Sequence, residues 1–153
     1  MIGVLAGGIV LAAAGAIILT LPHPSPSLTT DTLSSTLSDD AAKVAFLGRY
    51  LKLASPVEAA EFHVIYHDNS GGMVPGPSEW DIQAVMKVAP ADLPAWTSGM
   101  TPTEAADLSW GRSLLGPEPR WAVHSALRVY QRGRTIVAVF EPEGIVFKRA
   151  QAD

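Results

Sequence analysis

LRVYQRGRTIVAVFEPEGIVFK, residues 127–148, is the stretch that decides the fold, because three β-favouring segments follow one another with only tight turns between them. The segments are Leu127 to Gln131, Thr135 to Phe140 and Ile145 to Lys148. Each is rich in branched or aromatic side chains, which favour strands. Arg132-Gly133 and Glu141-Pro142-Glu143-Gly144 contain the residues that tight turns prefer. The stretch therefore predicts a meander of three strands.

Two further strands are predicted upstream of this meander. Side chains alternate along Phe62 to His67, and Trp80 to Val88 is rich in β-favouring residues. The connection between these segments contains Asp68-Asn69-Ser70-Gly71-Gly72 and Pro75-Gly76-Pro77, which break regular structure. We therefore expect about five mainly antiparallel strands.

Helical signals lie around these strands. Ser38, followed by two aspartates, is a candidate N-cap for a helix to about Leu53, with apolar residues recurring at the helical period. A short helix is expected over Pro90 to Trp96. Thr101-Pro102-Thr103-Glu104 has the capping-box pattern and predicts a helix to about Trp110. Residues 38–153 should thus form one soluble α+β domain, with two or three helices on one face of the sheet.

The start of the chain differs from the rest in composition. Residues 2 to 21 carry no charged side chain, and about 20 apolar residues at 1.5 Å per residue match a bilayer core of about 30 Å. The competing interpretation is a cleaved secretory signal, but this run is long for one and lacks a basic start. We therefore predict a transmembrane helix over residues 1–22, which acts as a signal-anchor and contacts membrane lipid.

Small residues within this segment predict a partner for it. Close approach of two helices in a membrane requires small side chains at the contact. Such residues recur at four-residue spacing at Gly3 and Gly7 and at Gly8, Ala12 and Ala16. The stripe indicates a protein partner that also has a transmembrane helix. Gly and Ala are common in membrane spans, however, so the pattern is equally compatible with a helix that has no partner.

Residues 23–37 are rich in Pro, Ser and Thr and almost uncharged, which predicts a linker. No Lys or Arg precedes Lys43, so the positive-inside rule does not fix the orientation of the span. With almost nothing before the span, the default for a signal-anchor is an amino terminus in the cytoplasm. We therefore expect a single-pass membrane protein whose domain lies on the extracytoplasmic, periplasmic side.

Composition excludes several classes of function. Cysteine is absent, which removes disulfides, thiolate metal sites and cysteine nucleophiles. The net charge of −4 argues against a nucleic-acid partner. Basic residues nevertheless outnumber acidic ones near the end of the chain, as Arg112, Arg120, Arg128, Arg132, Arg134, Lys148 and Arg149. One interpretation is a basic face that binds anionic lipid or an acidic partner. The other is that these residues are ordinary solvated strand ends and turns.

Three groups of residues are candidate chemical sites. His63 and His67 have a metal-pair spacing only if helical, whereas in a strand they emerge roughly 13 Å apart. Ser70 lies in a glycine-rich loop but lacks the first glycine of a nucleophile elbow. Glu79 and Asp81 share a face beside Trp80, as the acids and the aromatic platform of a sugar site do, but solvent exposure also produces acids near a strand start. Phosphate-loop and dinucleotide motifs are absent. We therefore expect no catalytic residue, metal or cofactor, and a chain that is not an enzyme.

The four tryptophans are the remaining candidates, at Trp80, Trp96, Trp110 and Trp121. Tryptophan is enriched at binding hot spots, although burial in a core is its more frequent fate. The resulting hypothesis is a membrane-anchored, non-catalytic accessory or structural subunit whose domain docks on a partner at the membrane surface. The alternative is a tethered domain that binds a small ligand or an envelope component through the 68 to 79 loop and Trp80.

Overall fold

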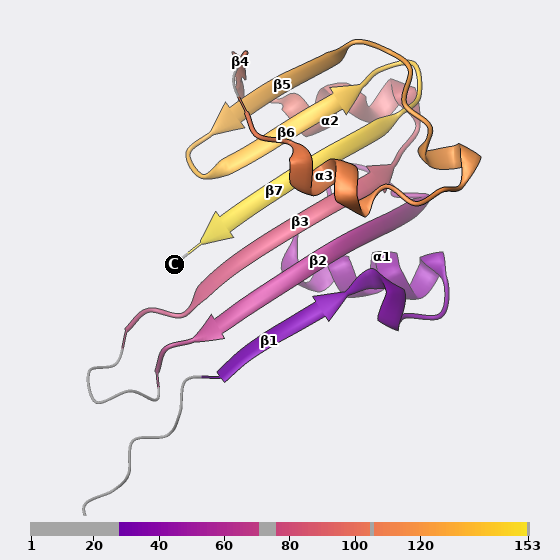
Figure 1. The fold of residues 1–153 in the computed structure, drawn as a ribbon. Coiled ribbons are helices and arrows are strands. Elements are labelled where there is room, and N and C mark those ends of the chain that lie inside the picture. Colours follow the sequence, from indigo (N-terminus) through magenta and orange to yellow (C-terminus); the bar gives the residue numbers. More distant parts are fainter. Residues whose placement is uncertain (1–27, 71–75, 105, 153) are drawn as a thin grey trace, which may run out of the picture.

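A seven-stranded antiparallel sheet forms the centre of the computed structural model, which describes residues 28–70, 76–104 and 106–152. The spatial order is β1-β2-β3-β7-β6-β5-β4 (Figure 1). The strands are β1 (Leu28–Leu33), β2 (Ala59–Asp68), β3 (Glu79–Lys87), β4 (Thr101–Thr103), β5 (Leu127–Arg132), β6 (Thr135–Phe140) and β7 (Ile145–Ala152). The α+β class and all five predicted strands are confirmed, and two short edge strands are added.

Helices lie on both faces of this sheet, whereas the sequence predicted them on one. In Figure 1 α1 and α2 lie behind the sheet and α3 in front of it. The described helical elements are α1 (Asp40–Tyr50), α2 (Leu93–Thr97), α3 (Ser109–Leu114) and the 3-10 turns η1 (Ser34–Thr36), η2 (Pro90–Asp92) and η3 (Pro119–Trp121). The predicted helices near residues 38–53 and 90–96 are therefore present. The N-cap of α1 is Asp39, whose carboxylate accepts a hydrogen bond from the Ala42 N–H.

The first face is the one that α1 and α2 cover. Alternation along the strands points one set of side chains toward these helices, including Phe62, Ile82 and Val146. Leu47 from α1 and Trp96 from α2 complete a continuous apolar layer with them. Phe62 is fully buried and its ring stacks on that of Phe46. Most of the apolar stabilisation of α1 therefore comes from this layer.

The second face carries the other set of alternating side chains, including Val85, Ala138 and Phe147. Its cover is α3 together with the irregular segment that follows, from which Trp110 and Trp121 insert into the layer. Gly111 lies so close to the Phe147 ring that no side chain fits between helix and sheet. The covered part of this face ends there, and mostly polar residues occupy the remainder.

Part of the stretch predicted as a linker, residues 23–37, has regular structure, because Leu28–Leu33 forms strand β1. Each residue of β1 pairs with β2, from Leu28 opposite Asp68 to Leu33 opposite His63. Strand β1 contains three threonines, which favour strands but also contributed to the linker-like composition. The strand is mostly exposed, so backbone pairing rather than burial holds it. A hydropathy pattern could not reveal such a strand.

The helix predicted from the capping box is wrong. Thr101–Thr103 is instead edge strand β4, which pairs antiparallel with β5. The helix α3 begins only at Ser109. A capping box is a local preference of about 1 kcal/mol, and pairing with an existing strand outweighs it.

The predicted anchor, with Gly3, Gly7, Gly8, Ala12 and Ala16, lies outside the described residues. Within the described ranges, no helix has the length and apolar character that crossing a bilayer requires.

Candidate functional site

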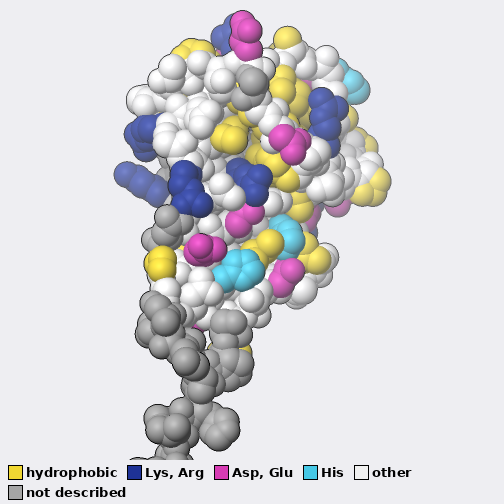
Figure 2. All heavy atoms as spheres, turned by 60° about the vertical axis from the view of Figure 1, so that its left-hand side comes forward, with side chains coloured by type: hydrophobic (Ala, Val, Ile, Leu, Met, Phe, Trp, Pro, Cys, Tyr) yellow, Lys and Arg dark blue, Asp and Glu magenta, His cyan; other side chains and the backbone are white. Residues whose placement is uncertain are grey.

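The uncovered part of the second face is the first candidate surface. We call it the open face and define it by Asp31, His63, Ile65, His67, Asp81, Gln83 and Arg149, which are all half-buried or exposed. Strand alternation brings these residues of β1, β2, β3 and β7 to one side of the sheet. Figure 2 shows the histidines here among acidic and basic side chains.

Two histidines of this face are held by side chains of β1. The imidazole Nε2 of His63 lies 2.6 Å from a carboxylate oxygen of Asp31. The Nδ1 of His67 lies 3.0 Å from the hydroxyl oxygen of Thr29. Both contacts are exposed, so each imidazole is oriented but remains accessible to solvent.

Asp81 and Arg149 form a second pair on the open face. The guanidinium donates two hydrogen bonds to the carboxylate, at 2.9 and 2.7 Å. Burial by itself would raise the pKa of Asp81, but hydrogen bonds from Arg149 and Gln83 outweigh it and keep that pKa below its ordinary value. The same pairing raises the pKa of Arg149. The pair is therefore fully charged at neutral pH, and its bidentate geometry fixes both side chains.

These contacts do not assemble into a recognisable catalytic or metal site. His63 and His67 lie in strand β2, as predicted, and no group of three metal-ligating side chains exists within the described part of the chain. Ser70 is exposed, and its backbone N–H donates to the Asp68 carboxylate. Glu79 and Asp81 share a face, as predicted, but Asp81 is occupied by Arg149. Residues 71–75 of the predicted ligand loop are outside the described ranges.

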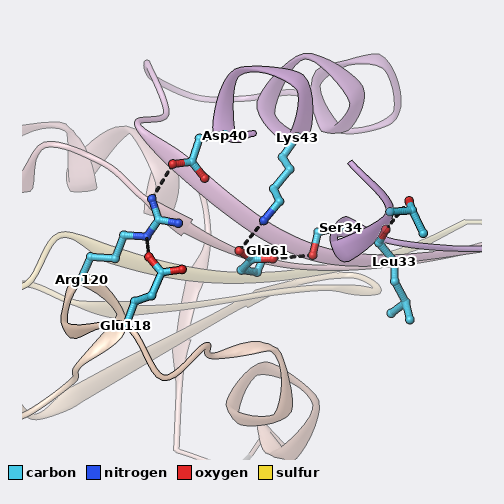
Figure 3. Close-up of polar contacts among 8 residues, drawn as sticks. Leu33, Ser34, Asp40, Lys43, Glu61, Glu118 and Arg120 are labelled. Atoms are coloured by element: carbon cyan, nitrogen blue, oxygen red, sulfur yellow. Dashed lines mark hydrogen bonds and ion pairs between the residues drawn. The ribbon is translucent and has the colours of Figure 1, made fainter. Parts of the chain in front are cut away.

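A half-buried cluster of charges joins the two sides of the domain around the edge of β2 (Figure 3). Glu61 accepts hydrogen bonds from the Ser34 hydroxyl at 2.5 Å and from the Lys43 ammonium at 2.7 Å. Nearby, Arg120 pairs with Asp40 at the start of α1 and with Glu118. The Asp40 hydrogen bond is the largest factor that raises the pKa of Arg120. Because every charge has a partner, we assign this cluster a structural role.

The second candidate surface is the aromatic corner, which we define as Leu28, Tyr50, Tyr66 and Trp80. The Trp80 ring contacts Tyr66 at a centroid distance of 4.2 Å and Tyr50 at 5.2 Å. Leu28 and Tyr50 are 63% and 42% exposed, so the corner presents apolar surface to solvent. A shallow pocket of about 300 Å³, which Tyr50 and Trp80 line, opens here on the first face.

The other three tryptophans have different surroundings. Trp96, Trp110 and Trp121 are 4%, 8% and 2% exposed, so all three lie in the apolar layers. The Trp96 indole N–H donates to Ser55, and that of Trp110 donates to the Asp107 carbonyl. Only Trp80 retains a substantial accessible surface. Tyr50, which contacts it, and Leu28, which lies on the same face of the sheet, are exposed, and no sequence motif marks either of them.

No family model, curated protein or solved structure matches this chain. Its function is therefore inferred from its own residues.

Proposed function

We propose that this protein is a membrane-anchored, non-catalytic accessory or structural subunit, whose domain docks on a protein partner at the membrane surface. The observation that carries the proposal is the aromatic corner. Leu28 is the first residue of β1, so the corner lies at the end of the sheet that continues into residues 1–27. A predicted span over residues 2–21 would hold this end of the domain nearest the bilayer.

The chemistry of the corner suits a protein partner. Tyr and Trp provide large contact areas at low cost in conformational entropy, and they dominate binding hot spots. Trp80 is already fixed by its contacts with Tyr50 and Tyr66, so little ordering is needed on binding. Arg49 lies at the same pocket and supplies a charge at its rim. An anchored domain also meets its partner at a raised effective concentration, which makes a small contact sufficient.

The alternative is binding of a small ligand or an envelope component beside Trp80. The pocket there is shallow, and His63 and His67 project from the opposite face of the sheet. The described lining therefore lacks both histidines, and Arg49 is its one charged side chain, which favours the docking proposal.

The test is purification of the tagged full-length protein in a gentle detergent, followed by mass spectrometry. Tyr50→Ala is compared with Leu33→Ala, a matched control because Leu33 is 45% exposed but belongs to the second face. We expect a defined complex that Tyr50→Ala weakens and Leu33→Ala retains. A Gly8→Leu, Ala12→Leu, Ala16→Leu variant tests the predicted contact between membrane helices separately.

A photo-crosslinking residue at position 50 identifies direct contact. The same residue at position 122 is the control, because Ala122 is exposed beside η3 on the second face. Crosslinks to one protein from position 50 alone would support docking at the corner. Recovery of the protein alone, or a complex that neither Tyr50→Ala nor the helix variant weakens, would overturn the proposal.

A further inference from the structure

A basic pocket of about 280 Å³ lies on the first face, apart from the aromatic corner. Its charged lining consists of Lys52, Arg132 and Lys148, and Trp96, Ser98 and Thr135 also line it. Lys52 follows α1, Arg132 is the last residue of β5, and Lys148 belongs to β7. Chain segments that are distant in sequence thus bring three cations to one concave site.

Lys148 is the central cation of this pocket. It follows two residues after the buried Val146, so strand alternation directs it to the first face between α1 and α2. Its ammonium lies 3.2 Å from the Lys52 carbonyl oxygen and 5.5 Å from the centre of the Trp96 ring. These contacts fix the side chain in a half-buried position. Burial, and then the charges of Arg132 and Lys52, lower the pKa of Lys148.

The charges of the pocket are not balanced within the described residues. None of Lys52, Arg132 and Lys148 forms an ion pair there, and no acidic side chain lines the pocket. By contrast, Arg120, Arg128 and Arg149 each pair with a carboxylate. Like charges held together in a half-enclosed site repel one another, and an anion would relieve that repulsion.

We propose that this pocket binds a phosphate group. Three positive charges exceed what a single carboxylate neutralises, whereas a phosphomonoester brings about −1.5 to −2 charges and three acceptor oxygens. Ser98 and Thr135 line the same space, and a hydroxyl is a neutral donor for phosphate oxygens. The guanidinium of Arg132 offers two parallel donors that match phosphate oxygens. The volume accommodates a phosphate with a small attached group.

Such a phosphate group has two sources, a free phosphomonoester or a lipid headgroup. The β5–β6 turn beside Arg132 lies at the same end of the sheet as the start of β1, since Thr135 is opposite Ala150 near the end of β7 (Figure 1). The pocket is therefore near the end of the domain that continues into residues 1–27. The proposal itself does not depend on an anchor or on a protein partner.

The test uses the full-length protein in micelles of an uncharged detergent. Inorganic phosphate is titrated in one arm, and phosphatidic acid is added to the micelles in the other, with binding followed by calorimetry. Lys148→Met and Arg132→Gln remove pocket charges. Arg128→Gln is the matched control, because Arg128 lies on the same strand as Arg132 but pairs with Glu141 outside the pocket. Lys148→Arg restores the charge, and circular dichroism confirms the fold of each variant.

We expect the Kd for phosphate to rise by about tenfold or more in Lys148→Met, the loss that one charge-assisted hydrogen bond produces. It should stay near the wild-type value in Arg128→Gln and recover in part in Lys148→Arg. Binding in the first arm identifies a free phosphate ligand, and binding confined to the second identifies a lipid headgroup. Absence of binding in both arms, or equal weakening by Lys148→Met and Arg128→Gln, would overturn the proposal.

Discussion

The two faces of the sheet are covered in different ways. On the first face, α1 and α2 form one apolar layer with alternating residues of β2, β3, β6 and β7. On the second face, the cover is the six-residue helix α3 and an irregular segment. Polar contacts hold that segment, from Arg120 to Asp40 and from Glu143 to residues 124 and 125. The first cover is thus mainly hydrophobic, and the second depends on charges as well.

This difference in cover determines where each face keeps groups that other molecules can reach. A continuous apolar layer leaves accessible groups only at its margins, which is where the aromatic corner and the basic pocket lie. The shorter cover of the second face leaves a whole strip of sheet accessible. There the Asp31 carboxylate contacts the His63 imidazole and Asp81 forms an ion pair with Arg149, so this strip has less need of a ligand.

The largest expected change in the free energy of unfolding comes from a residue of the first apolar layer, and a residue of the open face serves for comparison. Phe62→Ala should lower the free energy of unfolding by about 3–5 kcal/mol, because it removes a fully buried ring and leaves a cavity. Ile65→Ala removes a half-buried side chain on the open face and should cost less than about half as much. Urea denaturation of the full-length protein, followed by tryptophan fluorescence, measures both. Equal losses would show that the two faces contribute alike.

The sequence predicted the first face better than the second, for a physical reason. Periods of 2 and 3.6 residues arise where an element buries one side, and α1 and β2 have such a side. The segment over residues 106–126 buries Trp110 and Trp121 at irregular intervals, so no period marks it. Its helix α3 was missed, and the helix expected just before it is a strand.

The next effect concerns the turn between β6 and β7. Gly144 has a φ of +63°, and a Cβ there would collide with the Val88 carbonyl oxygen. Because that oxygen belongs to the backbone, it cannot move aside as a flexible side chain could. Gly144→Ala should therefore lower the free energy of unfolding by about 2 kcal/mol or more. Gly133→Ala is the matched control, because Gly133 has a φ of +57° but open space around it. It should cost only about 1 kcal/mol.

If the denaturation midpoints fall equally for the two variants, the strain of a positive φ alone would explain the cost of replacing either glycine. The contact between the β6–β7 turn and the end of β3 would then contribute little. A larger loss in Gly144→Ala would show that the Val88 N–H to Gly144 carbonyl hydrogen bond, at 2.9 Å, requires this close approach.

A third comparison uses a glycine in a helix on each face. Gly111→Ala in α3 places a methyl group against the Phe147 ring and should destabilise the protein by about 1–3 kcal/mol. Gly48→Ala in α1 meets only Leu53 at an ordinary contact distance of 3.6 Å and is exposed. It should stabilise by about 0.5–1 kcal/mol, because alanine favours a helix. Thermal unfolding of the two variants should thus shift in opposite directions, and a stabilising Gly111→Ala would contradict the observed packing.

The candidate sites were less predictable than the strands. The four tryptophans were recognised as a group, yet only Trp80 faces an accessible surface. Tyr50 and Trp80 are thirty residues apart, and their contact depends on how α1 packs on β3. The basic pocket similarly needs Lys52, Arg132 and Lys148, which no local motif connects. Sites of this kind depend on long-range packing, whereas residue spacing within one segment reports only local structure.

The smallest effect is a pH dependence of the second cover. Hydrogen bonds from the Ser125 hydroxyl and from the backbone N–H groups of His124 and Ser125 lower the pKa of Glu143 from 4.5 to about 2. Because the folded-state pKa lies below the unfolded value, this stabilisation is complete above about pH 4.5 and is lost as the pH falls toward 2.

Comparing Tm at about pH 5 and about pH 2.5 should give a smaller difference for Glu143→Gln than for the wild type. Glu104→Gln is the control, because Glu104 is exposed and accepts no such hydrogen bonds from described residues. If Glu143→Gln keeps the full wild-type difference, the covering segment is held by its tryptophans and not by this carboxylate.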